Sequence, residues 1–209
     1  MCQEKSFFVS TNIENRMIYR IRGMGRGSVF SPLDFYDLGS RDAVASALKR
    51  LKQAGSIRHL ARALYDFPKE DEVLGVLDPE LEVVIKALER RENMNIYPSE
   101  AYAAYGLGLT EQVPMSPVFV ALRPMTVQCG ARTIKIRKAP VKILAIKSRV
   151  SMSVAQALKW IGPQQVNDDR ISHLSLVLTE IQKAQLLKDI RYMPLNQHDV
   201  IRRIANVSR

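Results

Sequence analysis

Hydrogen-bonding side chains are concentrated at residues 40–46, where Ser40, Arg41, Asp42 and Ser46 supply hydroxyl, guanidinium and carboxylate groups. Successive residues of an α-helix are separated by about 100°, so Asp42 and Ser46 share one face and Val44 lies on the opposite face. Such groups at the start of a helix can hydrogen-bond to base edges in the major groove of DNA. For this helix taken alone, the alternative is an exposed amphipathic helix with solvated charges.

Further polar side chains follow this segment, on the same helix and on the β-prone run after it: Lys49, Arg50, Arg58, His59 and Arg62. Basic groups in such positions hold phosphates, so we expect these residues to contact the DNA backbone. Arg26 is another candidate phosphate contact, within the glycine-rich segment 22–28. That segment lacks the Lys-Ser/Thr of a P-loop and precedes a strand, which favours a flexible helix end.

Catalytic groups form no recognisable motif. Gly39-Ser40 could open a nucleotidyltransferase motif, but no two carboxylates one residue apart follow within the next 20 residues. The three histidines are scattered, and Cys2 and Cys129 lie far apart without metal-ligand spacing. We therefore expect a protein that is not an enzyme and that holds no metal or cofactor.

The elements that position the polar groups follow from apolar spacing and turn residues. Ile13, Met17 and Ile21 predict a helix over 13–22, ended by glycines. Ser40 can cap a further helix that ends at Gly55. Between them we expect a strand at 29–30 and a short helix at 32–38, and after them a hairpin of strands 57–60 and 63–67 around 61–62. This order predicts a winged helix-turn-helix.

Charge is unevenly distributed along the 209 residues. The net formal charge is +6 for 1–69, −7 for 70–116, +8 for 117–149 and +3 for 150–209, which gives the total of +10. We place a domain boundary after Lys69 and expect the acidic run that follows to be a solvated linker. No apolar run is long enough to span a bilayer and no signal peptide is evident, so we expect a cytoplasmic protein without membrane partners.

The second domain, 70–209, is expected to be mixed α/β, which makes the whole chain α+β. Helices are predicted at 77–91, 101–105 (capped by Ser99), 154–161, 168–190 and 195–207, and a small antiparallel sheet at 118–122, 125–129 and 132–137 with a turn at 130–131. Residues 117–149 contain no acid. They form a second basic patch, expected to bind an anionic partner unless it only confers solubility: Arg132, Lys135, Arg137, Lys138 and Lys142.

Several segments together resemble AbiEi-type antitoxins, in particular the shorter two-domain members of that family. The resemblance covers about residues 15–165 and is carried by 21–30 (IRGMGRGSVF), 38–41, 47–51, 57–66, 98–103, 108–109, 112–114 and 137–140. One departure is Ala63, where relatives usually carry glycine, so the backbone of the hairpin turn is expected to differ there.

The resemblance implies an antitoxin of a type IV toxin–antitoxin (abortive infection) system. Its winged-helix domain would bind operator DNA and repress its own operon, and the protein would counter a nucleotidyltransferase toxin without requiring a stable complex. The alternative is a stand-alone winged-helix regulator with a ligand-sensing second domain and no toxin partner. An RNA-binding role for the basic sheet ranks below both, since Phe119 is the one aromatic residue available there for base stacking.

Overall fold

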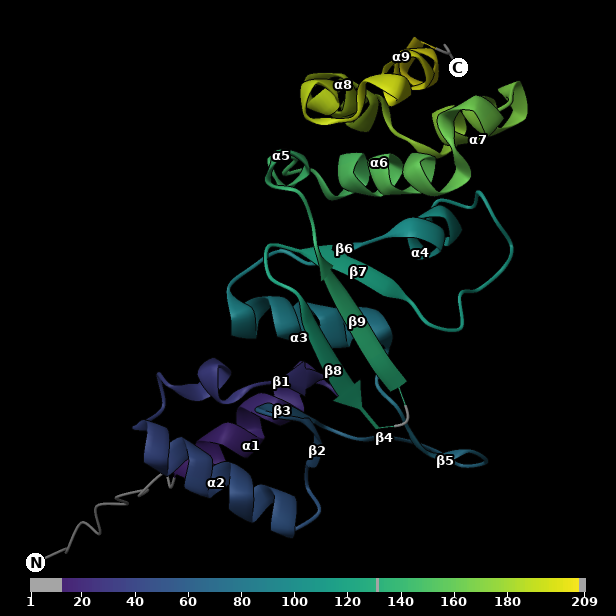
Figure 1. Cartoon of the computed structure of the whole chain (residues 1–209). Helices are drawn as coiled ribbons and strands as arrows, with labels where there is room; N and C mark the ends of the chain where they lie inside the picture. The colour runs from purple at the N-terminus through teal and green to yellow at the C-terminus, as the bar shows by residue number, and fades with distance from the viewer. Residues whose placement is uncertain (1–12, 131, 207–209) are drawn as a thin grey trace, which may run out of the picture. The chain divides into compact units, whose positions relative to one another are not determined.

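A computed structural model describes residues 13–130 and 132–206, which form helices and short strands throughout, so the fold is α+β (Figure 1). The chain divides into two units, the first ending at Asn93 and the second beginning at Met94. Within the described ranges, no helix combines the length and the apolarity needed to cross a membrane.

The first unit alternates helices with very short strands. Its elements are α1 (Ile13–Met24), β1 (Val29–Phe30), the 3-10 turn η1 (Pro32–Phe35), α2 (Arg41–Gln53), β2 (Arg58–Ala61), β3 (Leu64–Asp66), β4 (Lys69–Asp71), β5 (Gly75–Leu77) and α3 (Leu81–Glu92). Strands β1, β3 and β2 form an antiparallel sheet in that order, and β4 and β5 form a separate hairpin.

The helices around the 40–46 segment form where the sequence predicts them. Met17 and Ile21 of α1 are buried against Leu48 of α2, as expected from the apolar spacing. The Ser40 hydroxyl accepts a hydrogen bond from the backbone N–H of Ala43 at 3.3 Å, which confirms the predicted cap.

The helix predicted at 32–38 is shorter than expected. Only the single turn η1 forms, because the Leu38 N–H donates to the Phe35 carbonyl three residues back instead of to the Asp34 carbonyl four residues back. The Asp34 carbonyl accepts a hydrogen bond from Arg20 Nη1 at 2.9 Å, which joins this turn to α1.

The predicted hairpin is confirmed, but its turn lies at Arg62-Ala63 rather than at 61–62. Arg58 pairs with Asp66 across β2 and β3, and Ala61 with Leu64. Ala63 has φ +54°, in the left-handed region where a β-carbon is unfavourable.

We therefore expect Ala63→Gly to stabilise the first unit by about 0.5–1 kcal/mol, because it relieves the left-handed strain while adding some unfolded-state entropy. Urea unfolding with an unchanged m value would measure the gain. Ala61→Gly is the control: Ala61 lies within β2, so the same change should destabilise the protein. A loss of stability in Ala63→Gly would contradict the strain argument.

The segment after Lys69 is exposed, as expected, but it is not a linker, because it forms the β4–β5 hairpin within the first unit. The Asp71 carboxylate accepts the backbone N–H groups of Val73 and Leu74, both at 2.9 Å, and closes the turn. These backbone hydrogen bonds hold the pKa of Asp71 below its ordinary value.

The observed division after Asn93 also differs from the boundary predicted after Lys69. Two arginines of α3 tie this helix to the first unit. Arg90 donates to Asp34 Oδ1 at 3.1 Å and to the Val29 carbonyl at 3.0 Å, and Arg91 donates to the Arg62 carbonyl at 2.6 Å. Composition alone does not reveal these long-range contacts.

The second unit combines a four-stranded sheet with helices. Its elements are β6 (Tyr97–Pro98), α4 (Glu100–Gly106), β7 (Val118–Ala121), β8 (Met125–Cys129), β9 (Arg132–Lys138), α5 (Val141–Leu144), α6 (Arg149–Ile161), η2 (Pro163–Gln165), α7 (Asp168–Val177), α8 (Glu180–Asp189), η3 (Ile190–Tyr192), η4 (Leu195–Gln197) and α9 (His198–Asn206).

The sheet has the order β6-β7-β9-β8 and is mixed rather than purely antiparallel. The predicted β8–β9 pairing is confirmed, although residue 131 of its turn lies outside the described residues. Strands β7 and β9 are parallel, because β9 inserts between β7 and β8. The sequence pattern predicted β7, β8 and β9, but neither β6 nor the order of the strands in the sheet.

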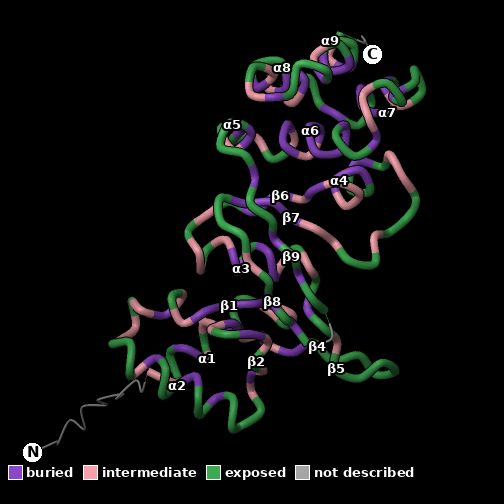
Figure 2. The backbone as a smooth tube through the Cα atoms, viewed as in Figure 1, coloured by how far each residue is buried: buried purple, intermediate pink, exposed green. Residues whose placement is uncertain are grey.

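Helix α6 is the core helix of the second unit, and Figure 2 shows it largely buried. The helix predicted at 168–190 is divided into α7 and α8, because Thr179 and Gln182 form a capping box that begins a new helix. The Ser99 side chain does not cap α4, as we had expected. It donates to Gln156 Oε1 of α6 at 2.9 Å.

Candidate nucleic-acid interface

One face of α2 is polar and exposed along its whole length. Val44, Ala47, Leu48 and Leu51 are buried in the core of the first unit. Figure 2 shows the resulting alternation of buried and exposed residues along this helix. The exposed positions include each residue predicted to contact DNA from α2 and its cap: Ser40, Arg41, Asp42, Ser46, Lys49 and Arg50.

Arg41 is oriented by a neighbouring aromatic ring at the start of α2. Its guanidinium carbon lies 5.7 Å from the centroid of Tyr36, within the range of a cation–π contact. This contact leaves Arg41 exposed beside the N-cap. The guanidinium is therefore available for a ligand that approaches the first turn of the helix.

Arg50 differs from the expected phosphate contact, because Nε lies 2.5 Å from Glu14 Oε2. The pair joins α2 to α1 and offsets the charge of Arg50. Lys49, its neighbour, is exposed on the same helix. The structure thus favours Lys49 over Arg50 as a cation directed to a partner.

The contacts of Arg58 argue against its predicted role as a phosphate clamp, because three of its five N–H donors are used within the first unit. Its guanidinium forms two hydrogen bonds to the Asp66 carboxylate, at 3.1 and 2.6 Å, and a third to the Leu77 carbonyl at 2.8 Å. The hydrogen bond to Asp66 raises the pKa of Arg58 above its ordinary value. Arg58 therefore fixes the base of the β4–β5 hairpin to the first sheet.

The other predicted contacts of the β2–β3 hairpin are exposed. The His59 ring lies edge-on to Tyr65 with centroids 5.3 Å apart, and Arg62 is at the turn. The backbone carbonyl of Arg62 accepts a hydrogen bond from Arg91. The Arg62 side chain is exposed at the tip of the hairpin, as expected of a wing.

The glycine-rich segment is folded against the chain rather than forming a phosphate cradle. The Gly27 N–H donates to the Phe67 carbonyl at 2.6 Å. Arg26 donates to the Pro68 carbonyl at 2.9 Å, and its guanidinium lies 4.9 Å from the Phe67 ring centroid. These contacts weaken the case for Arg26 as a phosphate ligand, although the residue is exposed.

The second basic patch is exposed, but the pleat of β9 divides it. Lys135 and Arg137 alternate with the buried Ile134 and Ile136, whereas Arg132 and Lys138 fall in register with these isoleucines. Arg137 also pairs with Glu100 of α4 at 2.8 Å. The strand therefore does not present one continuous cationic face, and Lys142 lies apart from it on α5.

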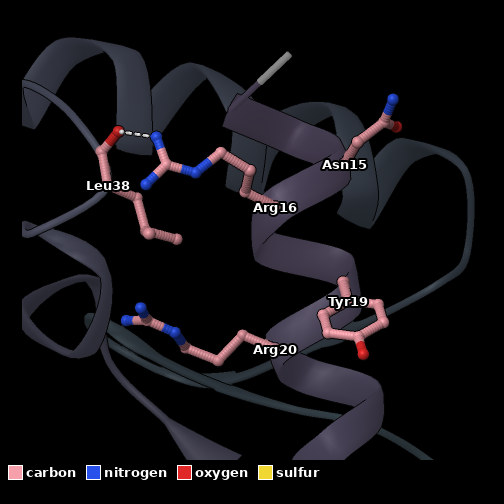
Figure 3. Close-up of a pocket in the computed structure, with 5 residues that line it drawn as sticks. All are labelled: Asn15, Arg16, Tyr19, Arg20 and Leu38. Atoms are coloured by element: carbon pink, nitrogen blue, oxygen red, sulfur yellow. Dashed lines mark hydrogen bonds between the residues drawn. The ribbon is translucent and has the colours of Figure 1, made fainter. Parts of the chain in front are cut away.

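A hollow on the first unit was not predicted. It has a volume of about 620 Å³ and is lined by Asn15, Arg16, Tyr19, Arg20 and Leu38 (Figure 3). Arg20 makes two hydrogen bonds of 2.7 Å to Asp37, and they hold the pKa of this carboxyl below its ordinary value. The feature of the sequence that could have indicated this hollow is the i, i+4 spacing of Arg16 and Arg20 on the polar side of α1.

The fold and this surface define a two-unit α+β protein whose first unit exposes a polar helix face bordered by basic side chains. The chain belongs to the Family of unknown function (DUF6088), whose sequence profile matches residues 16–186.

Comparison with curated proteins gave no match. A similar solved structure is that of the RV2827C protein from Mycobacterium tuberculosis. It has 14% sequence identity and a TM-score of 0.45, with 93% of this chain and 76% of that chain covered. A similarity of this size does not bear on function.

Proposed function

We propose that the chain binds duplex DNA through a winged helix-turn-helix in its first unit. The observation that carries the proposal is the exposed polar face of α2, which begins at the capped N-terminus with Ser40 and Arg41. A recognition helix uses its first residues on base edges in the major groove.

The surrounding topology supports this assignment. Helix α1, strand β1, turn η1 and helix α2 precede the β2–β3 hairpin, and β1 pairs with β3. The exposed turn of this hairpin follows α2 directly in the chain, which supports a role for the hairpin as the wing and for α2 as the recognition helix. The basic side chains Lys49 and Arg62 would neutralise phosphates there.

Arg41→Ala is expected to cost about 1–3 kcal/mol of discrimination between the target duplex and a scrambled one, because a base contact is lost. Lys49→Ala should weaken binding to both duplexes alike and reduce the slope of log K against log salt by about 0.9, as for one phosphate. Fluorescence anisotropy with the duplex from upstream of the coding sequence would measure both effects. Equal losses on both duplexes in Arg41→Ala would contradict base reading by α2.

We further propose that this DNA binding represses the chain's own operon, and that the chain is an antitoxin that counters a nucleotidyltransferase toxin. The support is the set of motifs that resemble AbiEi-type antitoxins. The test is growth after co-expression of the full chain with the neighbouring gene, which the proposal requires to encode a nucleotidyltransferase. Rescue of growth supports the antitoxin role, whereas DNA binding without rescue favours the stand-alone regulator.

A further inference from the structure

The hollow on α1 lies beside the start of the proposed recognition helix. Leu38, which forms part of its lining, precedes the N-cap Ser40 by two residues. Arg16 Nη1 donates to the Leu38 carbonyl at 3.4 Å, so the guanidinium lies next to the turn that leads into α2. A ligand in this hollow would contact the segment that sets the position of α2.

The lining combines an apolar surface with two guanidinium groups. In Figure 3, Arg16 and Arg20 reach from α1 toward Leu38 and lie on either side of its side chain, whereas Asn15 and Tyr19 project in another direction. Positions i and i+4 are about 6 Å apart along a helix axis. A ligand in the hollow would therefore contact the apolar Leu38 side chain and have a guanidinium group on either side of it.

The charges of the hollow suit a single negative group. Asp37 accepts two hydrogen bonds from Arg20, which offset the charge of that arginine. Arg16 makes one long hydrogen bond to Leu38, although a guanidinium has five N–H donors. The group formed by Arg16, Arg20 and Asp37, two cations and one anion, thus has a formal net charge of +1.

We propose that this hollow holds one nucleotide of the DNA backbone, with the deoxyribose against Leu38 and a phosphodiester on Arg16. The inference rests on the proposed DNA binding and extends it to a contact outside α2 and the hairpin. A phosphodiester carries one negative charge, and guanidinium groups bind phosphate oxygens through paired hydrogen bonds. Arg20, held by Asp37, acts as a positioning residue that maintains the wall of the hollow.

The test compares Arg16→Gln, Arg16→Lys and the control Lys86→Gln, which removes one exposed charge from α3 of the same unit. Affinity is measured by anisotropy on the upstream duplex and a scrambled duplex over a range of salt concentrations. Arg16→Gln should bind both duplexes about 5- to 10-fold more weakly, with a salt slope shallower by about 0.9. Arg16→Lys should keep the wild-type slope, and Lys86→Gln should behave as wild type.

Identical affinity and slope for Arg16→Gln and Lys86→Gln would overturn the inference while leaving DNA binding intact. So would a loss confined to the upstream duplex, since a backbone contact does not distinguish sequences. If the wild-type protein binds neither duplex, the proposed function itself fails. Equal thermal unfolding of the three variants excludes a folding defect as the cause of weaker binding.

Discussion

Arg58→Ala is expected to destabilise the first unit by about 3 kcal/mol, because it leaves the Asp66 carboxylate buried without its cation. The Asp66 side chain is 1% exposed, and Arg58 supplies two hydrogen bonds to it. The substitution also removes the hydrogen bond that holds the Leu77 carbonyl at the base of the β4–β5 hairpin. Urea unfolding at neutral pH would measure the loss.

Two further variants separate this explanation from a role of Arg58 in DNA binding. Arg62→Ala removes an exposed arginine from the neighbouring turn and should change stability by less than about 0.5 kcal/mol. The double variant Arg58→Ala/Asp66→Asn should recover part of the loss, since a neutral amide is less costly to bury than a carboxylate. An Arg58→Ala protein with wild-type stability and weakened DNA binding would restore the phosphate-clamp assignment.

Gly108→Ala is expected to destabilise the second unit by about 2–3 kcal/mol, from left-handed strain and a lost hydrogen bond. Gly108 has φ +69°, and an added β-carbon would lie 2.8 Å from His173 Nε2. His173 cannot retreat without cost, because the same nitrogen lies 2.9 Å from the Leu107 carbonyl. The substitution therefore disturbs the contact between α7 and the end of α4.

Gly106→Ala provides a matched control two residues earlier, because a β-carbon there would meet no atom within 4 Å. This variant should be neutral or slightly stabilising at the end of α4, as alanine is the better helix former. Unfolding of Gly108→Ala/His173→Ala separates the two causes. The double variant should lose less than the sum of the single losses if the steric contact contributes. Purely additive losses would attribute the effect of Gly108→Ala to backbone strain alone.

The burial and capping of α2 in the candidate interface could be predicted from residues close together in the sequence. The spacing of Val44, Leu48 and Leu51 predicted which face of α2 is buried, because a helix fixes the direction of each side chain relative to its neighbours. The cap at Ser40 was equally local, since it depends on a hydrogen bond to Ala43 within the first turn. The exposure of Ser46 follows from the same periodicity, whereas Arg41, close to the Leu48 side of the helix, is exposed because it is the first residue of α2.

The roles of the arginines required the tertiary structure. Arg50, Arg58 and Arg62 are chemically alike in the sequence, yet the first pairs with Glu14, the second pairs with the buried Asp66, and the third stays at an exposed turn. A guanidinium can pair with any carboxylate that the fold brings within reach. Sequence position therefore does not decide which arginine is available to a partner.

Local sequence by itself determined most of the helices, the first hairpin and strands β7, β8 and β9, because periodicity, caps and turn residues act over a few residues. Only the tertiary structure decided the parallel β7–β9 pairing, the attachment of α3 to the first unit and the hollow between α1 and Leu38. Each depends on contacts between segments distant along the chain. The energy of those contacts depends on which distant groups the fold brings together. Residues that are neighbours in the sequence do not specify these pairings.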